Sequence, residues 1–168
     1  MMQGTHGISG MGDMKMDLHE TVKRAKAPAI AMAAVAVCGE VAILYSGIAG
    51  IAVFLIQIIL LVYAGNLTEK KHWAGLLPAG GVGALVGIIG ALSASLAHSA
   101  IILTIHTFAP CPSCIPYGVL DALKDFVTGG AFNAFFWAIV GFILGAIGAI
   151  IPTKKEGLID ITELPPDW

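Results

Sequence analysis

Three long apolar stretches constrain this chain more than any other feature of its sequence. They run from Ala27 to Gly65, from about Trp73 to Phe108, and from about Ala131 to Pro152. A helix that crosses the hydrocarbon core of a bilayer needs about 20 apolar residues, so each stretch is long enough to span a membrane. The sequence therefore predicts an all-α integral membrane protein.

The composition agrees with a lipid environment and excludes nucleic acid as a partner. Of the 168 residues, 57% are hydrophobic and 12% are charged, and the charged share is about half that of a soluble domain. A soluble fold of this size cannot bury so much apolar surface. The net charge is −2, and the chain has no basic patch of the size that nucleic acid requires. The lipid bilayer is the partner that the composition predicts.

The stretch from Ala27 to Gly65 fits either one overlong helix or two short ones, and Tyr45–Gly50 contains Ser and Gly residues that suit a turn. The distribution of charge decides between them, because cytoplasmic loops carry an excess of Lys and Arg. The basic residues gather in three places, which are Lys23, Arg24 and Lys26, then Lys70 and Lys71, and finally Lys154 and Lys155. Four spans place all three clusters on one side of the membrane, whereas three spans would not.

The chain is predicted to have four spans, which cover residues of about 28–46, 48–65, 79–107 and 131–151. They form a membrane domain over 27–152. A polar N-terminal segment over 1–26 and a tail over 153–168 are both expected in the cytoplasm, so the protein is predicted to be a multi-pass protein of the cell membrane. The span over 79–107 is longer than the bilayer requires and should tilt or project beyond it.

The segment between the third and fourth spans is predicted to lie outside the cell and to be amphipathic. In this outer loop, over 108–130, Pro116 suits the first turn of a helix and Gly129–Gly130 would end it. Apolar residues recur at helical spacing, and they are Val119, Leu120, Leu123, Phe126 and Val127. We therefore expect a short amphipathic outer helix on the membrane surface, between the third and fourth transmembrane helices.

Two cysteines in this outer loop suggest chemistry. Cys111 and Cys114 stand in the stretch HTFAPCPSCIPYG, and an outer loop is an oxidising environment that favours a disulfide between them. The preferred interpretation is a disulfide that closes a sharp turn. A catalytic dithiol and a metal site with His106 are the alternatives, but zinc takes four ligands and no fourth is apparent. No residue pattern identifies a cofactor.

A four-helix membrane protein with an outer CxxC pair resembles the vitamin K epoxide reductases. This resemblance implies a membrane thiol–disulfide oxidoreductase that uses Cys111 and Cys114. Those enzymes also need a second cysteine pair to relay electrons, whereas Cys38 is the one other cysteine of this chain.

Polar residues inside the apolar stretches form a second candidate site. Glu40 follows the start of its stretch by about 20 Å of helix, and a charge at that depth costs at least about 2.5 kcal/mol. His98 and Gln57 are expected at a similar depth, while Ser95 and Ser99 share one face of the third span. We therefore expect a buried polar cluster around a Glu40–His98 pair. It is either a proton or cation site or a hydrogen-bonded cluster that holds the helices together.

A glutamate inside the first of four spans also resembles the small multidrug-resistance transporters. The residues that carry the resemblance are CGEVAILYSG, which begins at Cys38 and contains Glu40. The resemblance implies a transport function. This chain differs from those transporters in its greater length, its extra outer helix and the absence of an apparent aromatic cage.

Glycine pairs at GxxxG spacing indicate close helix packing. Gly83 and Gly87 lie in the third predicted span, and Gly141 and Gly145 lie in the fourth. Glycine lets the backbones of two membrane helices approach closely. We expect these faces to pack the third span against the fourth or against another subunit, so the predicted partners are further copies of this chain or other membrane subunits.

These features favour a transport-related protein, or a non-catalytic subunit of a membrane complex, over an enzyme. The sequence contains no nucleotide-binding loop and no complete set of metal ligands, which disfavours most enzyme classes. The alternative is the thiol–disulfide oxidoreductase described above.

Overall fold

The computed structural model describes residues 18–72, 75–109 and 116–151, and these residues are almost entirely helical. The helices are α1 (Leu18–Tyr45), α2 (Gly47–His72), α3 (Leu76–Phe108) and α4 (Val119–Ile150). Each of them is long and apolar enough to cross a membrane. The prediction of an all-α protein with four membrane-spanning helices is therefore confirmed.

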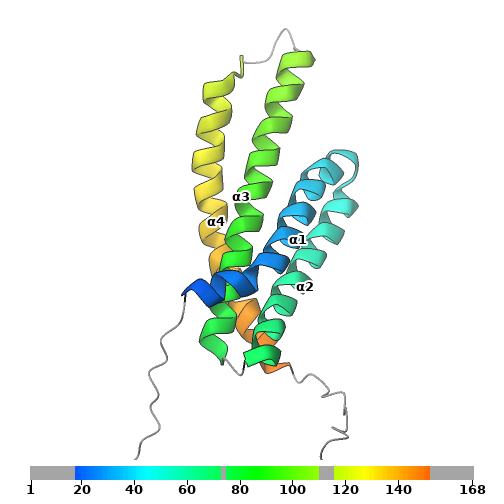
Figure 1. Cartoon of the computed structure of the whole chain (residues 1–168). Helices are drawn as coiled ribbons and strands as arrows, with labels where there is room; N and C mark the ends of the chain where they lie inside the picture. Colours follow the sequence, from blue (N-terminus) through cyan, green and yellow to red (C-terminus); the bar gives the residue numbers. More distant parts are fainter. Residues whose placement is uncertain (1–17, 73–74, 110–115, 152–168) are drawn as a thin grey trace, which may run out of the picture.

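The four helices form two antiparallel hairpins, α1–α2 and α3–α4 (Figure 1). Helix α3 packs on all of the other helices and most extensively on α4, whereas α1 and α4 do not meet within the described residues. Helices α2 and α4 end, and α3 begins, at one end of the bundle, which we call the terminal end, and α1 begins in the same half of the bundle (Figure 1). The opposite end holds the α1–α2 turn, and we call it the hairpin end. The two hairpins diverge toward the hairpin end (Figure 1).

Ser46 separates α1 from α2, so the long first apolar stretch holds two helices. The Oγ of Ser46 accepts a hydrogen bond from the backbone N–H of Ile48 over 3.2 Å. This bond satisfies one of the N–H groups that lack a partner at the start of a helix. The turn expected within Tyr45–Gly50 is therefore a single residue, and the helix resumes directly after it.

The amphipathic segment after Gly118 is helical, but it forms the first part of α4. Gly129–Gly130, which were expected to end it, lie inside a continuous helix. Gly130 is buried, and a Cβ atom there would contact Ser95 and Leu92 of α3. The helix continues through both glycines although each costs roughly 1 kcal/mol inside a helix. The expected outer helix is thus a projecting part of α4 and not a separate element.

Helices α3 and α4 are longer than a bilayer requires. They contain 33 and 32 residues, which correspond to about 50 Å of helix against a hydrocarbon core of about 30 Å. Both extend past the α1–α2 turn at the hairpin end (Figure 1). At the start of α4, the carboxylate of Asp121 accepts a hydrogen bond from the N–H of Gly118 over 2.9 Å, so this projecting end is capped.

Glycines bring α3 and α4 into backbone contact. A Cβ atom at Gly83 would meet the carbonyl of Gly141, and a Cβ atom at Gly141 would meet the carbonyl of Gly83. Gly87 and Gly145 also face backbone atoms of the opposite helix. The GxxxG faces therefore pack α3 against α4 within one chain.

The bundle has small residues inside and large apolar residues outside. Its core cluster consists of Ala25, Ala29, Met32, Leu61, Ala64, Val82 and Val86. Large side chains such as those of Ile59, Phe132 and Phe135 are exposed on the outer surface. Lipid is as apolar as these side chains, so close packing of small residues holds the helices together instead of burial of large ones.

Asn66 of α2 caps the end of α4, a contact that the sequence analysis did not anticipate. Its Nδ2 donates to the carbonyl of Gly148 over 3.0 Å and to that of Ile151 over 3.2 Å. The last carbonyls of a helix have no partner within that helix. The amide of Asn66 supplies one and ties α2 to α4 at the terminal end.

We expect Asn66→Ala to lower the free energy of unfolding by about 1 kcal/mol, the size of a typical hydrogen bond between membrane helices. Thr104→Ala is the matched control, because the hydroxyl of Thr104 donates to the carbonyl of Ala100 in its own helix over 2.7 Å. Unfolding in a denaturing detergent, followed by circular dichroism, measures both variants. Equal stability of Asn66→Ala and the wild type would contradict the capping role.

Candidate functional site

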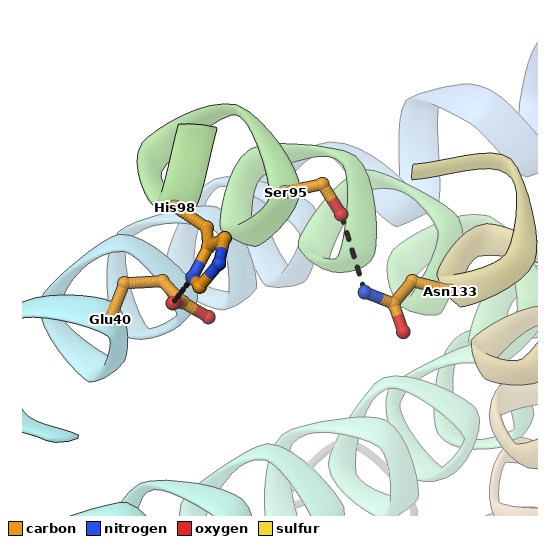
Figure 2. Close-up of polar contacts among 4 residues, drawn as sticks. All are labelled: Glu40, Ser95, His98 and Asn133. Carbon is orange, nitrogen blue, oxygen red and sulfur yellow. Dashed lines mark hydrogen bonds and ion pairs between the residues drawn. The ribbon is translucent and has the colours of Figure 1, made fainter. Parts of the chain in front are cut away.

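Glu40 of α1 and His98 of α3 point toward each other (Figure 2). The Oε2 atom of Glu40 lies 3.0 Å from the Nδ1 atom of His98. At this distance the imidazole donates a hydrogen bond to the carboxylate, or a protonated carboxyl group donates to the imidazole. The structure thus brings together the two residues on which the predicted polar cluster depends.

The packing of α1 on α2 directs Glu40 toward α3. Gly39 is buried, and a Cβ atom there would meet the side chain of Val53 in α2. Successive residues of an α-helix point about 100° apart around the helix axis. When Gly39 faces α2, the next residue is turned toward the side of α1 on which α3 lies.

The pair lies in an open groove of about 590 Å³ between α1, α3 and α4. The polar side chains that line it are those of Glu40, Ser95, His98, Ser99, Asp125, Thr128 and Asn133. The apolar ones are those of Ile43, Leu44, Ile101, Ile102 and Ile105. His98 is 59% exposed and Glu40 is 23% exposed, so the pair is open to the groove and not sealed in the core. The divergence of the two hairpins accounts for this exposure.

The polar lining continues from the pair toward the hairpin end. Glu40 lies about 8 Å of helix before the end of α1 at Tyr45, and His98 lies about 15 Å before the end of α3 at Phe108. Asp125 belongs to the projecting part of α4. Groove-lining polar groups therefore extend from the membrane-spanning part of the bundle to its projecting part.

The other residues of the predicted cluster divide into two groups. Ser95 and Ser99 are buried and line the groove, and the Oγ of Ser95 accepts a hydrogen bond from the Nδ2 of Asn133 over 3.3 Å (Figure 2). Gln57 is not among the described residues that line it. Because α1 and α2 are joined by a one-residue turn, Gln57 lies about 8 Å deeper than Glu40 along the hairpin.

A second set of contacts ties α3 to α4 at the hairpin end. The ring centroids of His106 and Tyr117 are 5.3 Å apart, and the Tyr117 hydroxyl donates to the Oδ2 of Asp125 over 2.8 Å. This hydrogen bond is the main reason that the pKa of Tyr117 is raised to about 12, and the charge of Asp121 adds to it. The Tyr117 hydroxyl therefore remains a donor at neutral pH and holds Asp125 beside the groove.

Cys111 and Cys114 lie outside the described residues, so the disulfide, the catalytic dithiol and the metal site with His106 all stay predictions. Cys38 is a free, exposed thiol on α1. Within residues 18–72, 75–109 and 116–151, no group of three or more His, Cys, Asp or Glu side chains is placed to hold a metal ion.

Fold and composition define the class of this protein: it is a small polytopic membrane protein with four apolar helices. The chain matches no protein-family model, and no curated protein or solved structure shows a significant match to it. Its function is therefore inferred from the groove and the pair within it.

Proposed function

We propose that this protein transports protons across the membrane, with Glu40 and His98 as the proton-binding pair. The observation that carries this proposal is the 3.0 Å contact between the two side chains in an open polar groove. Ionisable side chains inside a span are costly, and they mark proton and ion pathways. A hydrogen-bonded carboxyl group and imidazole can pass a proton between them, because each has an atom that accepts one.

The charges that line the groove favour a cation over an anion as the transported species. Glu40 and Asp125 contribute carboxylates, and neither Lys nor Arg is among the described residues that line the groove. An anion would meet two groups of like charge. A proton fits better than a metal ion, because a proton needs one acceptor whereas divalent metal ions take four or more ligands.

We further propose that the hairpin end faces the outside of the cell and that both termini are cytoplasmic. The support is the distribution of basic residues. Lys70 and Lys71 belong to the end of α2, which is at the terminal end, and Lys23 and Lys26 lie near the start of α1, in the same half of the bundle. The groove then opens toward the outer surface.

Proton flux in reconstituted vesicles tests the proposed function. The purified chain is placed in liposomes that contain a pH-sensitive dye, and a potassium gradient with an ionophore sets the membrane potential. We expect the internal pH to change faster than in protein-free liposomes. Equal rates with and without the protein would contradict the proposal.

The two outer cysteines provide a test against the oxidoreductase alternative. We expect the double variant Cys111→Ser/Cys114→Ser to retain the wild-type proton flux, because the proposed pair lies on α1 and α3 and contains no thiol. Flux is compared in the same liposomes, with and without a reducing agent. A flux that disappears in the double variant would assign the activity to the thiols.

A further inference from the structure

A second groove, of about 420 Å³, lies between the first turns of α1 and the facing part of α3. Six of its residues lie on one face of α1, and they are Val22, Lys23, Ala25, Lys26, Ala29 and Ile30. The same face continues to Ala33, and Leu85 and Ile89 of α3 form the opposite wall. From Lys23 to Ala33 the groove follows about 15 Å of helix. It lies closer to the terminal end than the Glu40–His98 pair does, and the two grooves share no lining residue.

The groove combines an apolar floor with two positive charges at one end. Lys23 and Lys26 are exposed and three positions apart, so their side chains leave the same side of α1. The apolar part of α1 that crosses the membrane begins at Ala25. The lysines therefore flank the start of this apolar part, and the rest of the groove follows it toward Ala33. No carboxylate is among the described residues that line it.

We propose that this groove binds an anionic phospholipid, with the phosphate near Lys23 and Lys26 and one acyl chain along Ala29, Ile30 and Ala33. The occupant has to be apolar along most of its length and negative at the end beside the lysines, and a phospholipid with a net negative headgroup has both properties. Basic pockets between membrane helices bind such headgroups. Small alanines leave room for the chain, and each buried methylene adds to the affinity.

Native mass spectrometry of the full chain in a mild detergent tests this site. The protein is titrated with phosphatidylglycerol and with phosphatidylcholine of the same acyl chains. We expect phosphatidylglycerol to bind more tightly by about fivefold for each lysine. In Lys23→Gln/Lys26→Gln its affinity should fall to that of phosphatidylcholine. Lys23→Arg/Lys26→Arg should keep the preference because it keeps both charges.

Three controls make the outcome decisive. Lys124→Gln removes an exposed lysine from α4 at the hairpin end and should leave the lipid preference unchanged. Ala33→Leu fills the groove and should weaken both lipids. Glycerol phosphate, which has the headgroup charge without acyl chains, should not compete with phosphatidylglycerol. Competition by glycerol phosphate would mean that the site binds phosphate and not lipid.

Equal affinity of the wild type for the two lipids would overturn the proposal, and so would an unchanged preference in Lys23→Gln/Lys26→Gln. If that variant fails to fold, the salt dependence of the wild type decides. A preference that arises from the lysines weakens as ionic strength rises, and a preference that is independent of salt would refute it.

Discussion

Replacing Glu40 by Gln is expected to reduce proton flux through reconstituted protein by about 100-fold, which is the lower end of what one positioned proton-transfer group contributes. The substitution keeps the size and hydrogen-bonding capacity of the side chain, but an amide cannot take up or release a proton near neutral pH. The partner His98 stays in place 3.0 Å away. A loss of flux would therefore report the missing titration and not a missing contact.

Two variants separate this effect from a general disturbance of the helices. Glu40→Asp keeps a carboxyl group and should restore part of the flux. Gln57→Leu changes a polar residue of a neighbouring span that does not line the groove, and it should leave the flux at the wild-type level. If Glu40→Gln conducts as well as the wild type, the carboxyl group only holds the helices together. If Gln57→Leu is equally impaired, the flux depends on bundle integrity in general.

Replacing Gly141 by Leu is expected to destabilise the native bundle strongly. A Cβ atom at this position would meet the carbonyl of Gly83, which is a backbone atom that cannot move aside alone. The two helices would have to separate along their most extensive contact. Overpacking of a well-packed core usually costs 1–3 kcal/mol, and a clash against backbone places this variant at about 3 kcal/mol or more.

Gly129→Leu is the matched control for the packing prediction. Gly129 lies in the same helix, but no atom lies within 4 Å of the position of its Cβ atom. The two variants therefore add the same side chain to the same helix in two different surroundings. Unfolding in a denaturing detergent should show a large loss of stability for Gly141→Leu and a small change for Gly129→Leu. Similar losses in both would contradict the close approach of α3 and α4.

Much of the fold could be predicted from the sequence, because it depends on the length of apolar stretches and on the sidedness of charge. The number of spans and the turn near Ser46 follow from these two properties. The glycine spacing predicted that these faces pack closely, but it left open whether the third span meets the fourth or another subunit, and the structure shows Gly83 against Gly141. The end of the outer segment was predicted wrongly, because local propensity favours a break at Gly129–Gly130 whereas the helix continues through both residues.

The candidate site was harder to predict, because it depends on side-chain direction and on how the hairpins diverge. Counting residues placed Glu40 and His98 at similar depths, and they lie within hydrogen-bonding distance. The same count placed Gln57 at a similar depth, but it lies about 8 Å deeper than Glu40 along the hairpin. The hydrogen bond between Asn133 and Ser95 could not be predicted, because it depends on the register in which α4 packs on α3. Nothing in the sequence indicated that the pair would be open to a groove.

The central claim is that Glu40 and His98 together bind the transported proton, and infrared difference spectroscopy of the protein in lipid tests it most directly. Spectra recorded over a series of pH values should contain the carbonyl band of a carboxyl group that gains and loses a proton. This band should be absent in Glu40→Gln and should shift in His98→Asn. A spectrum without a band that depends on Glu40 would contradict the claim.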